Sequence, residues 1–295
     1  MSKNYGTLKS SLTILITLLP STSMSGLLES IDNKLTQELP VSGDSLAQYK
    51  TGYKYYSGEE VAVDYKEALK WFKLAADHGV PEAQNYIGVM YEKGEGVPLD
   101  LQEANNWYRL AADQGLVSAQ HKLGWMYTHG IGVPRDYKEA IKWYRLAAEQ
   151  GLVDAQLDLG GMYVYEQGGL RDEKKTIKWL LKAAEQRNVR AQRFLGAIFY
   201  YGLGVTQDYA EAVKWHKKAA EQGDSSAQNI LGAMYERGRG TPKDYVKAYK
   251  WFSVSGESGS RHGRIYREKI GKRKMTPEQI AEAQGLAKEW MEKHN

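Results

Sequence analysis

The side chains that most often carry metal or acid–base chemistry are sparse in this 295-residue sequence. Its histidines are His78, His121, His129, His216, His262 and His294. No two of them stand four residues apart, the spacing with which a helix presents two imidazoles to one zinc ion. The chain has no cysteine, which excludes disulfides, thiolate metal ligands and cysteine nucleophiles. We therefore expect neither a metal nor a cofactor.

One string matches a catalytic motif. Lys50-Thr51-Gly52 has the K-T-G pattern of the serine enzymes that recognise penicillins, where it accompanies a nucleophilic serine in an S-x-x-K motif. No S-x-x-K occurs anywhere in the chain, and Gly52 belongs to a periodic set described below. A β-lactam-hydrolysing enzyme is thus the weakest function considered, and the sequence favours a protein that is not an enzyme.

The elements that would position any site follow from a period of 36 residues. It is carried by six tryptophans: Trp71, Trp107, Trp143, Trp179, Trp215 and Trp251. A period of this size marks a stacked-repeat protein, whose units are too small to bury their apolar faces alone. A glycine also recurs inside the first helix of every repeat: Gly52, Gly88, Gly124, Gly160, Gly196 and Gly232. Because glycine costs a helix about 1 kcal/mol relative to alanine, we expect the two helices of each repeat to touch backbones there.

The second repeat shows the local pattern. Apolar residues recur at helical spacing over 83–91, and Gly94 and Pro98 then end this helix. Asp100 opens the second helix as an N-cap, which stabilises a helix by about 1 kcal/mol. The same aspartate recurs in the other repeats: Asp64, Asp136, Asp172, Asp208 and Asp244. The pattern predicts two antiparallel helices of roughly 12 residues per repeat.

These residues resemble the Sel1-like repeat, a relative of the tetratricopeptide repeat. The shared pattern is an initial alanine, Leu-Gly, tyrosine, Gly-x-Gly, aspartate, Ala-x-x-Trp-aromatic, Ala-Ala and a final glycine. The resemblance implies an all-α fold, a right-handed α-solenoid of six 36-residue helix-turn-helix repeats over 47–262 with N- and C-terminal capping helices. It also implies protein partners, and exported bacterial members of the family often act at the cell envelope or on host cells.

The N-terminal residues 1–25 lie outside the repeats. Lys3 and Lys9 precede an apolar run over 12–19, and small residues follow before Gly26. This arrangement is typical of a secretory signal peptide, and the run is too short to span a membrane. It predicts a periplasmic or secreted protein; because threonines dilute the run, the alternative is a cytoplasmic protein with a frayed N-terminus.

Capping segments are expected at both ends of the array. Residues 26–46 read as an amphipathic capping helix and a linker, and residues 263–295 as a basic segment and a closing helix. Thr276 and Gln279 form a capping box at the start of that last helix. The basic residues over 261–274 have Tyr266 as their one aromatic neighbour, so we interpret them as a solvated helix face and expect no nucleic-acid partner.

The resemblance places the first helix of each repeat on the concave, ligand-binding side. On each of these helices the apolar residues at helical spacing are expected to face the core. The other positions provide the candidate partner-binding residues: Tyr49, Tyr53, Tyr56, Asn85, His121, Trp125, Thr128, Arg193 and Tyr200. Trp125 is outside the periodic set, and the following repeats have Gly161 and Ala197 at its position. Those small residues either leave a pocket beside Trp125 or make room for it to pack against the fourth repeat.

The predicted function is that of a non-enzymatic adaptor that binds protein partners through this concave face. The alternative is binding of a glycan or peptidoglycan at the cell envelope, because aromatic faces stack on sugar rings and polar neighbours such as Asn85 and His121 would bind hydroxyl groups. We expect a protein that does not span a membrane.

Overall fold

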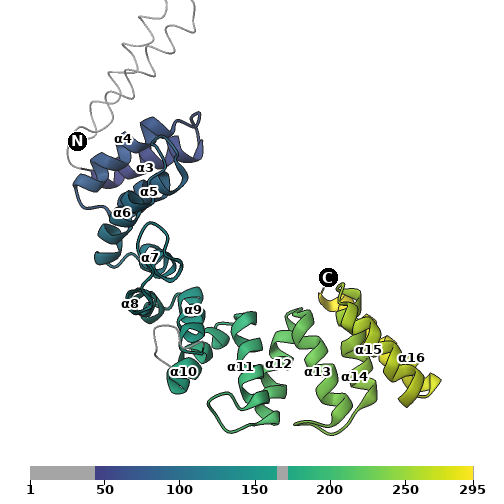
Figure 1. Cartoon of the computed structure of the whole chain (residues 1–295). Coiled ribbons are helices and arrows are strands. Elements are labelled where there is room, and N and C mark those ends of the chain that lie inside the picture. Colours follow the sequence, from purple (N-terminus) through teal and green to yellow (C-terminus); the bar gives the residue numbers. More distant parts are fainter. Residues whose placement is uncertain (1–43, 165–171, 295) are drawn as a thin grey trace, which may run out of the picture. The chain divides into compact units, whose positions relative to one another are not determined.

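The computed structural model describes residues 44–164 and 172–294 (Figure 1). Within these ranges the chain forms 14 α-helices and no strand, which confirms the predicted all-α solenoid. The predicted signal peptide, and the capping helix expected over 26–39, lie outside the described residues. None of the described helices is both long enough and apolar enough to cross a membrane.

Each repeat is a pair of helices, which we name A and B. The A helices are α3 (Ser45–Ser57), α5 (Pro81–Lys93), α7 (Val117–His129), α9 (Val153–Val164), α11 (Val189–Tyr201) and α13 (Ser225–Arg237). The B helices are α4 (Tyr65–Asp77), α6 (Leu101–Asp113), α8 (Tyr137–Glu149), α10 (Glu173–Glu185), α12 (Tyr209–Glu221) and α14 (Tyr245–Glu257). A seventh pair follows, α15 (Arg261–Lys274) and α16 (Pro277–His294).

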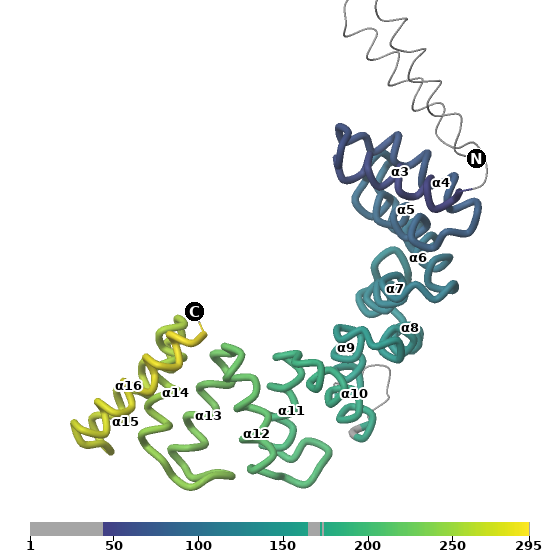
Figure 2. The backbone as a smooth tube through the Cα atoms, turned by 180° about the vertical axis from the view of Figure 1, so that it is seen from behind, coloured from purple at the N-terminus to yellow at the C-terminus, as the bar shows by residue number. Residues whose placement is uncertain are grey.

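The chain divides into two compact units after Val80. The first unit holds α3 and α4, which pack on each other. The second holds α5 to α16, in which each helix from α5 to α14 packs on the next and α16 also packs on α14 (Figure 2).

Local signals set the helix ends as predicted. The side chain of Asp100 accepts hydrogen bonds from the backbone N–H groups of Gln102 and Glu103. Each of the other five periodic aspartates also caps its B helix, by accepting a bond from the N–H group three residues on. Several A helices end on a glycine in the left-handed conformation, such as Gly130 with φ 70°. At α16, the Thr276 N–H donates to Gln279 Oε1 and the Gln279 N–H donates to Thr276 Oγ1, at 3.1 and 3.3 Å, so the capping box is also present.

The periodic glycines mark a close approach, but its partner differs from the prediction. A Cβ at each glycine would lie 2.5–2.9 Å from a large side chain of the B helix, twenty residues further on. The pairs are Gly52–Phe72, Gly88–Tyr108, Gly124–Tyr144, Gly160–Leu180, Gly196–His216 and Gly232–Phe252. The expected backbone-to-backbone contact is therefore wrong, because a buried side chain lies flat against the glycine and fills the space between the two helices.

A periodic glutamine joins neighbouring repeats. The buried Gln120 donates through Nε2 to the carbonyl oxygen of Ala112 on the preceding B helix, at 3.1 Å. Its Oε1 accepts a hydrogen bond from Gln150 Nε2, at the end of its own B helix, at 2.8 Å. The same glutamine pair occurs three more times: Gln84–Gln114, Gln156–Gln186 and Gln192–Gln222. Gln156 and Gln192 donate to the preceding B helix as Gln120 does, so these three amides each bridge two helix pairs and satisfy polar groups inside the stack.

Candidate functional site

A cavity of about 200 Å³, which we name the Trp125 pocket, opens between α7, α9 and α11. Trp125 and Thr128 lie on one wall, and Gly161 and Phe194 lie on another. Trp125 is 36% exposed, so it is not a core residue. A Cβ at Gly161 would meet no atom of the described chain within 4 Å. A cavity therefore lies beside Trp125, as the first of the two interpretations expects, and residues of the fourth repeat form part of its wall.

Neighbouring side chains hold the Trp125 indole in place. The Lys122 ammonium lies 4.7 Å from a ring centroid of Trp125, and Lys122 is paired with Glu92 at 2.6 Å. On the next turn, the His129 imidazole lies 4.7 Å from the indole, and its Nδ1 is 2.8 Å from the Trp125 carbonyl oxygen. An aromatic side chain that is already positioned loses little conformational entropy when it binds.

Two other predicted residues of this repeat make contacts within the solenoid. His121 Nε2 lies 2.9 Å from Asp158 Oδ2, which links the third and fourth repeats. Thr128 Oγ1 donates to the Gly124 carbonyl oxygen at 2.8 Å. Burial and the nearby Asp158 carboxylate raise the pKa of Tyr144, so the wall of the Trp125 pocket holds a neutral phenol.

A second cavity of about 420 Å³, which we name the Tyr200 pocket, lies between α11, α13 and α15. Tyr200 lines it, and Arg239 bonds to the Tyr200 hydroxyl. Two lining residues from α15, His262 and Tyr266, were not among the predicted site residues. The repeat period could not indicate them because α15 follows the last repeat.

His216 lies beneath the Tyr200 pocket and is fully buried. Neither of its ring nitrogens has a hydrogen-bond partner among the described residues. Burial lowers the pKa of His216 to about 4, which keeps the ring neutral at pH 7. Four of the other repeats have an aromatic ring here, and in the second the Tyr108 hydroxyl donates to Glu92 at 2.6 Å. The smaller imidazole fills this core position and leaves its ring nitrogens without a partner among the described residues beside the cavity.

The remaining predicted residues do not line these two cavities. Tyr49, Tyr53 and Tyr56 belong to the first unit, where Tyr49 and Tyr56 lie 6.0 and 6.2 Å from the Phe72 ring. Asn85 is half-buried on α5. Arg193 forms an ion pair with Asp224 at 3.5 Å. Of the predicted partner-binding residues, Trp125 and Thr128 therefore line one cavity and Tyr200 lines another, and the others line neither.

The K-T-G string lies inside α3. Thr51 Oγ1 donates to the Ala47 carbonyl oxygen at 2.9 Å, and Gly52 packs under Phe72. Elsewhere in the described ranges, no group of three histidine, aspartate or glutamate side chains is placed to hold a metal ion.

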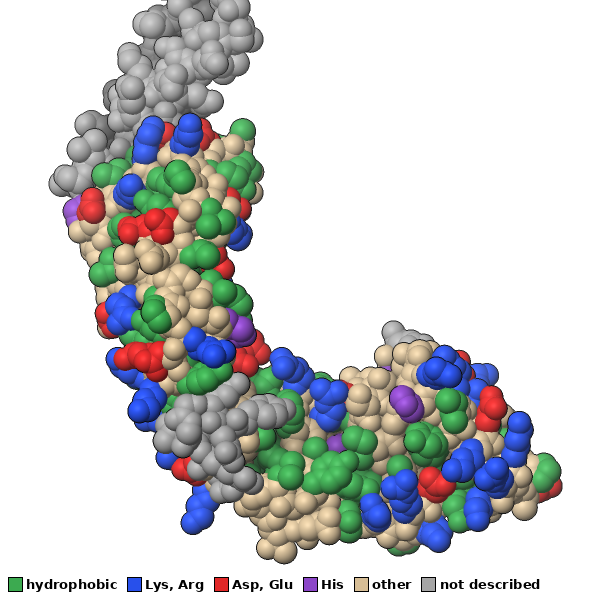
Figure 3. Space-filling view, in the orientation of Figure 1, with side chains coloured by type: hydrophobic (Ala, Val, Ile, Leu, Met, Phe, Trp, Pro, Cys, Tyr) green, Lys and Arg blue, Asp and Glu red, His purple; other side chains and the backbone are tan. Residues whose placement is uncertain are grey.

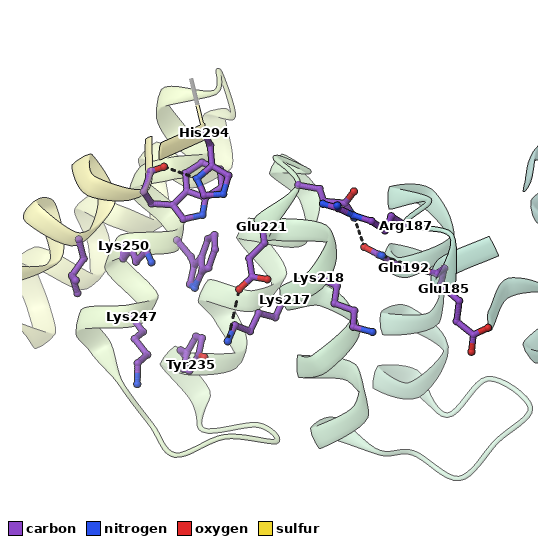
Figure 4. A pocket seen from close by; sticks show the side chains of 15 residues that line it. Glu185, Arg187, Gln192, Lys217, Lys218, Glu221, Tyr235, Lys247, Lys250 and His294 are labelled. Carbon is purple, nitrogen blue, oxygen red and sulfur yellow. Dashed lines mark hydrogen bonds and ion pairs between the residues drawn. The ribbon is translucent and has the colours of Figure 1, made fainter. Parts of the chain in front are cut away.

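A third cavity, the B-helix pocket, has a volume of about 820 Å³ and lies among α10, α12, α14 and α16 (Figure 4). No residue of this pocket was among the predicted site residues. Its walls combine lysines with the aromatic side chains of Tyr235, Trp251 and Trp290. On the face shown in Figure 3, Lys and Arg side chains also gather over α14 to α16.

The helix pairs and their regular contacts define an α-solenoid, a class of repeat protein built for binding. The family model of the Sel1 repeat matches six consecutive segments: 45–80, 81–116, 117–152, 153–188, 189–224 and 225–260. The chain belongs to the Sel1 repeat family. Proteins with this repeat are generally protein-interaction adaptors, and the fold is typically a non-enzymatic scaffold.

Two solved structures are similar over most of the chain. One is c5321, a protective antigen present in uropathogenic Escherichia coli strains, with 34% identity and a TM-score of 0.74 over 92% of this chain. This chain covers 57% of the length of that antigen. The other is a Sel1 repeat protein from Oxalobacter formigenes, with 33% identity, a TM-score of 0.68, and coverage of 82% of this chain and 99% of that one. No curated protein matches the sequence.

Proposed function

We propose that this protein is a non-enzymatic adaptor that binds a protein partner through the exposed face of its A helices. The observation that carries the proposal is the partly exposed Trp125 beside the cavity that Gly161 leaves open. Tryptophan is enriched among the residues that contribute most of the energy of protein interfaces. A volume of about 200 Å³ is smaller than a typical small-molecule site, and it suits one side chain of a partner.

The walls of the Trp125 pocket indicate what that side chain is. Leu157, Met162 and Phe194 supply apolar surface, and Asp158 and Arg190 supply one charge of each sign. An apolar anchor such as leucine or methionine fits this lining, because its burial against the three apolar side chains is favourable.

Filling the cavity from within tests this proposal. Partners are captured with the purified protein and identified, and the affinity of one captured partner is then measured for Gly161→Leu. The leucine has open space on the free surface, so folding is kept while the anchor is excluded. Gly285 on α16 also has open space around its Cβ, so Gly285→Leu is the matched control. Unchanged affinity for a folded Gly161→Leu variant would contradict the proposal.

Glycan binding is the second candidate, and the Tyr200 pocket favours it. The free ring nitrogens of His216 and the free Oδ1 of Asn229, buried without a partner among the described residues, can bind hydroxyl groups. Tyr200 and Tyr266 offer aromatic surface beside them. Calorimetric titration with muropeptides tests this function: heat that is lost in His216→Phe supports it, and no heat at millimolar ligand excludes it.

We also propose export to the periplasm or the medium, on the basis of residues 1–25 alone. The cytoplasmic alternative predicts an intact N-terminus.

A further inference from the structure

We propose that the B-helix pocket binds an acidic peptide segment. This site is separate from the A-helix face, so the proposal stands or falls independently of the function proposed above. The first observation is its charge: Arg187, Lys217, Lys218, Lys247 and Lys250 line the pocket, against the two carboxylates of Glu185 and Glu221.

Three of these cations replace the residue that the repeat usually has at their position. Arg187 stands where five repeats have glycine: Gly79, Gly115, Gly151, Gly223 and Gly259. Lys218 stands where three repeats have leucine: Leu74, Leu110 and Leu146. Lys247 stands where four repeats have glutamate: Glu67, Glu103, Glu139 and Glu211. The fourth repeat has the same two lysine exchanges, at Lys175 and Lys182. Each replacement adds positive charge, and the three lie in one pocket.

The exchange at Arg187 carries a structural cost. Its φ is 64°, in the left-handed region that is unfavourable for residues other than glycine. The five glycines at this turn have φ of 80–94° and fit it without strain. Strained residues of this kind concentrate at binding sites, and Arg187 lines the pocket.

The exchange at Lys247 changes the pairing of its neighbour. In three other repeats the glutamate at this position pairs with the lysine three residues on, as Glu211 does with Lys214 at 3.0 Å. Lys247 pairs instead with Asp244 at 3.0 Å, and Lys250 has no ion pair within the described chain. Lys250 lies on the face of Trp251, 4.8 Å from the ring centroid, and burial lowers its pKa. The carboxylates of Glu289 and Glu221 attract Lys250 only from beyond ion-pair distance, so this half-buried cation can still pair with a carboxylate of a ligand.

The cations lie on both sides of α12. Figure 4 shows Lys217 and Glu221 on the side that faces α14, and Lys218 on the side that faces Glu185. The Lys218 ammonium is 4.3 Å from a ring centroid of Trp215. A ligand that reaches both groups of cations must cross the helix, so an extended chain fits better than a compact anion.

The rest of the lining favours a peptide over a phosphate polymer. Glu185 and Glu221 would repel a backbone with a charge on every unit, whereas a peptide can place neutral residues beside them. Trp290 adds an apolar wall, with its ring 5.8 Å from Trp251 and stacked on His294 at 4.1 Å. We therefore expect acidic side chains spaced by apolar ones.

Fluorescence anisotropy with a fluorescein-labelled peptide of alternating glutamate and leucine tests the proposal on the full chain. We expect the glutamate peptide to bind at least about tenfold more tightly than its glutamine counterpart, with affinity that falls as salt rises. Lys218→Leu restores the residue of other repeats and should weaken binding about threefold, within the range of exposed charge pairs. Lys182→Leu removes the same charge one repeat earlier, outside the lining, and should leave binding unchanged.

Arg187→Gly separates binding from folding. It restores the glycine of the turn, so the melting temperature should rise while affinity for the glutamate peptide falls. Equal affinity for the glutamate and glutamine peptides would overturn the proposal, as would equal effects of Lys218→Leu and Lys182→Leu. Tighter binding of an oligonucleotide or of inorganic polyphosphate than of the peptide would assign the pocket to phosphate and overturn it as well.

Discussion

Gln150 donates a hydrogen bond to Gln120 across 30 residues of sequence, at 2.8 Å. The same Gln120 amide donates to Ala112 of the second repeat, so one side chain joins the two helices of its own repeat and links them to the preceding repeat. Four repeats have this glutamine pair. In the first and sixth repeats the donor position holds His78 and Ser258. The Oε1 atoms of Gln48 and Gln228 then remain buried without a partner among the described residues.

Ser258→Gln should complete this pairing in the sixth repeat. The new amide can donate to Gln228 Oε1, and a net hydrogen bond contributes about 0.5–1.5 kcal/mol to the free energy of unfolding. Urea denaturation measures the gain. Gln150→Ser is the converse control and should cost about 1–3 kcal/mol, because it leaves Gln120 Oε1 buried and unpaired. A loss of stability in Ser258→Gln would show that the pairing needs more than this side chain.

Trp143 and Trp125 should respond in opposite ways to alanine. Trp143 is 2% exposed within the core of its repeat, so Trp143→Ala should lower the free energy of unfolding by about 3–5 kcal/mol. Trp125→Ala should leave thermal unfolding nearly unchanged and weaken a captured partner by about 2 kcal/mol, which is about thirtyfold in affinity. Normal affinity with reduced stability in Trp125→Ala would assign it to packing.

Stability should decrease in mild acid because of His216. Its pKa is about 4 in the folded chain and 6.5 in the unfolded chain, so the unfolded state binds the proton more tightly. The stabilising contribution is therefore complete above pH 6.5 and is lost as the pH falls toward 4. Between pH 7 and pH 5 the expected loss is about 2 kcal/mol.

His216→Phe tests the assignment, because Phe72 and Phe252 fill the same position in two other repeats. Urea denaturation at pH 7 and pH 5 should show a smaller pH dependence in this variant than in the original chain. The same dependence in both would place its origin elsewhere.

Export predicts a processed N-terminus. Protein purified from the source cells should begin near Gly26 when its N-terminal residues are sequenced. Intact protein that begins at Met1 or Ser2 in the cytosolic fraction would establish the cytoplasmic alternative.

The sequence by itself determined the repeat and its helices. Their signals are local: Asp100 caps a helix through the N–H groups beside it, and Gly130 ends a helix through its own φ angle. The exposed position of Trp125 also followed from the helical period, because the geometry of one helix is enough to tell its core-facing positions from its exposed ones.

Contacts between helices were decided only by the tertiary structure. Gly88 signalled a close approach, but the Tyr108 ring that fills it depends on how the two helices pack. The B-helix pocket was not predictable from the period, because Arg187, Lys218 and Trp290 come from three places in the chain. Each repeat defines its own helices through neighbouring residues, whereas a pocket exists only where repeats stack and the last helix closes against them.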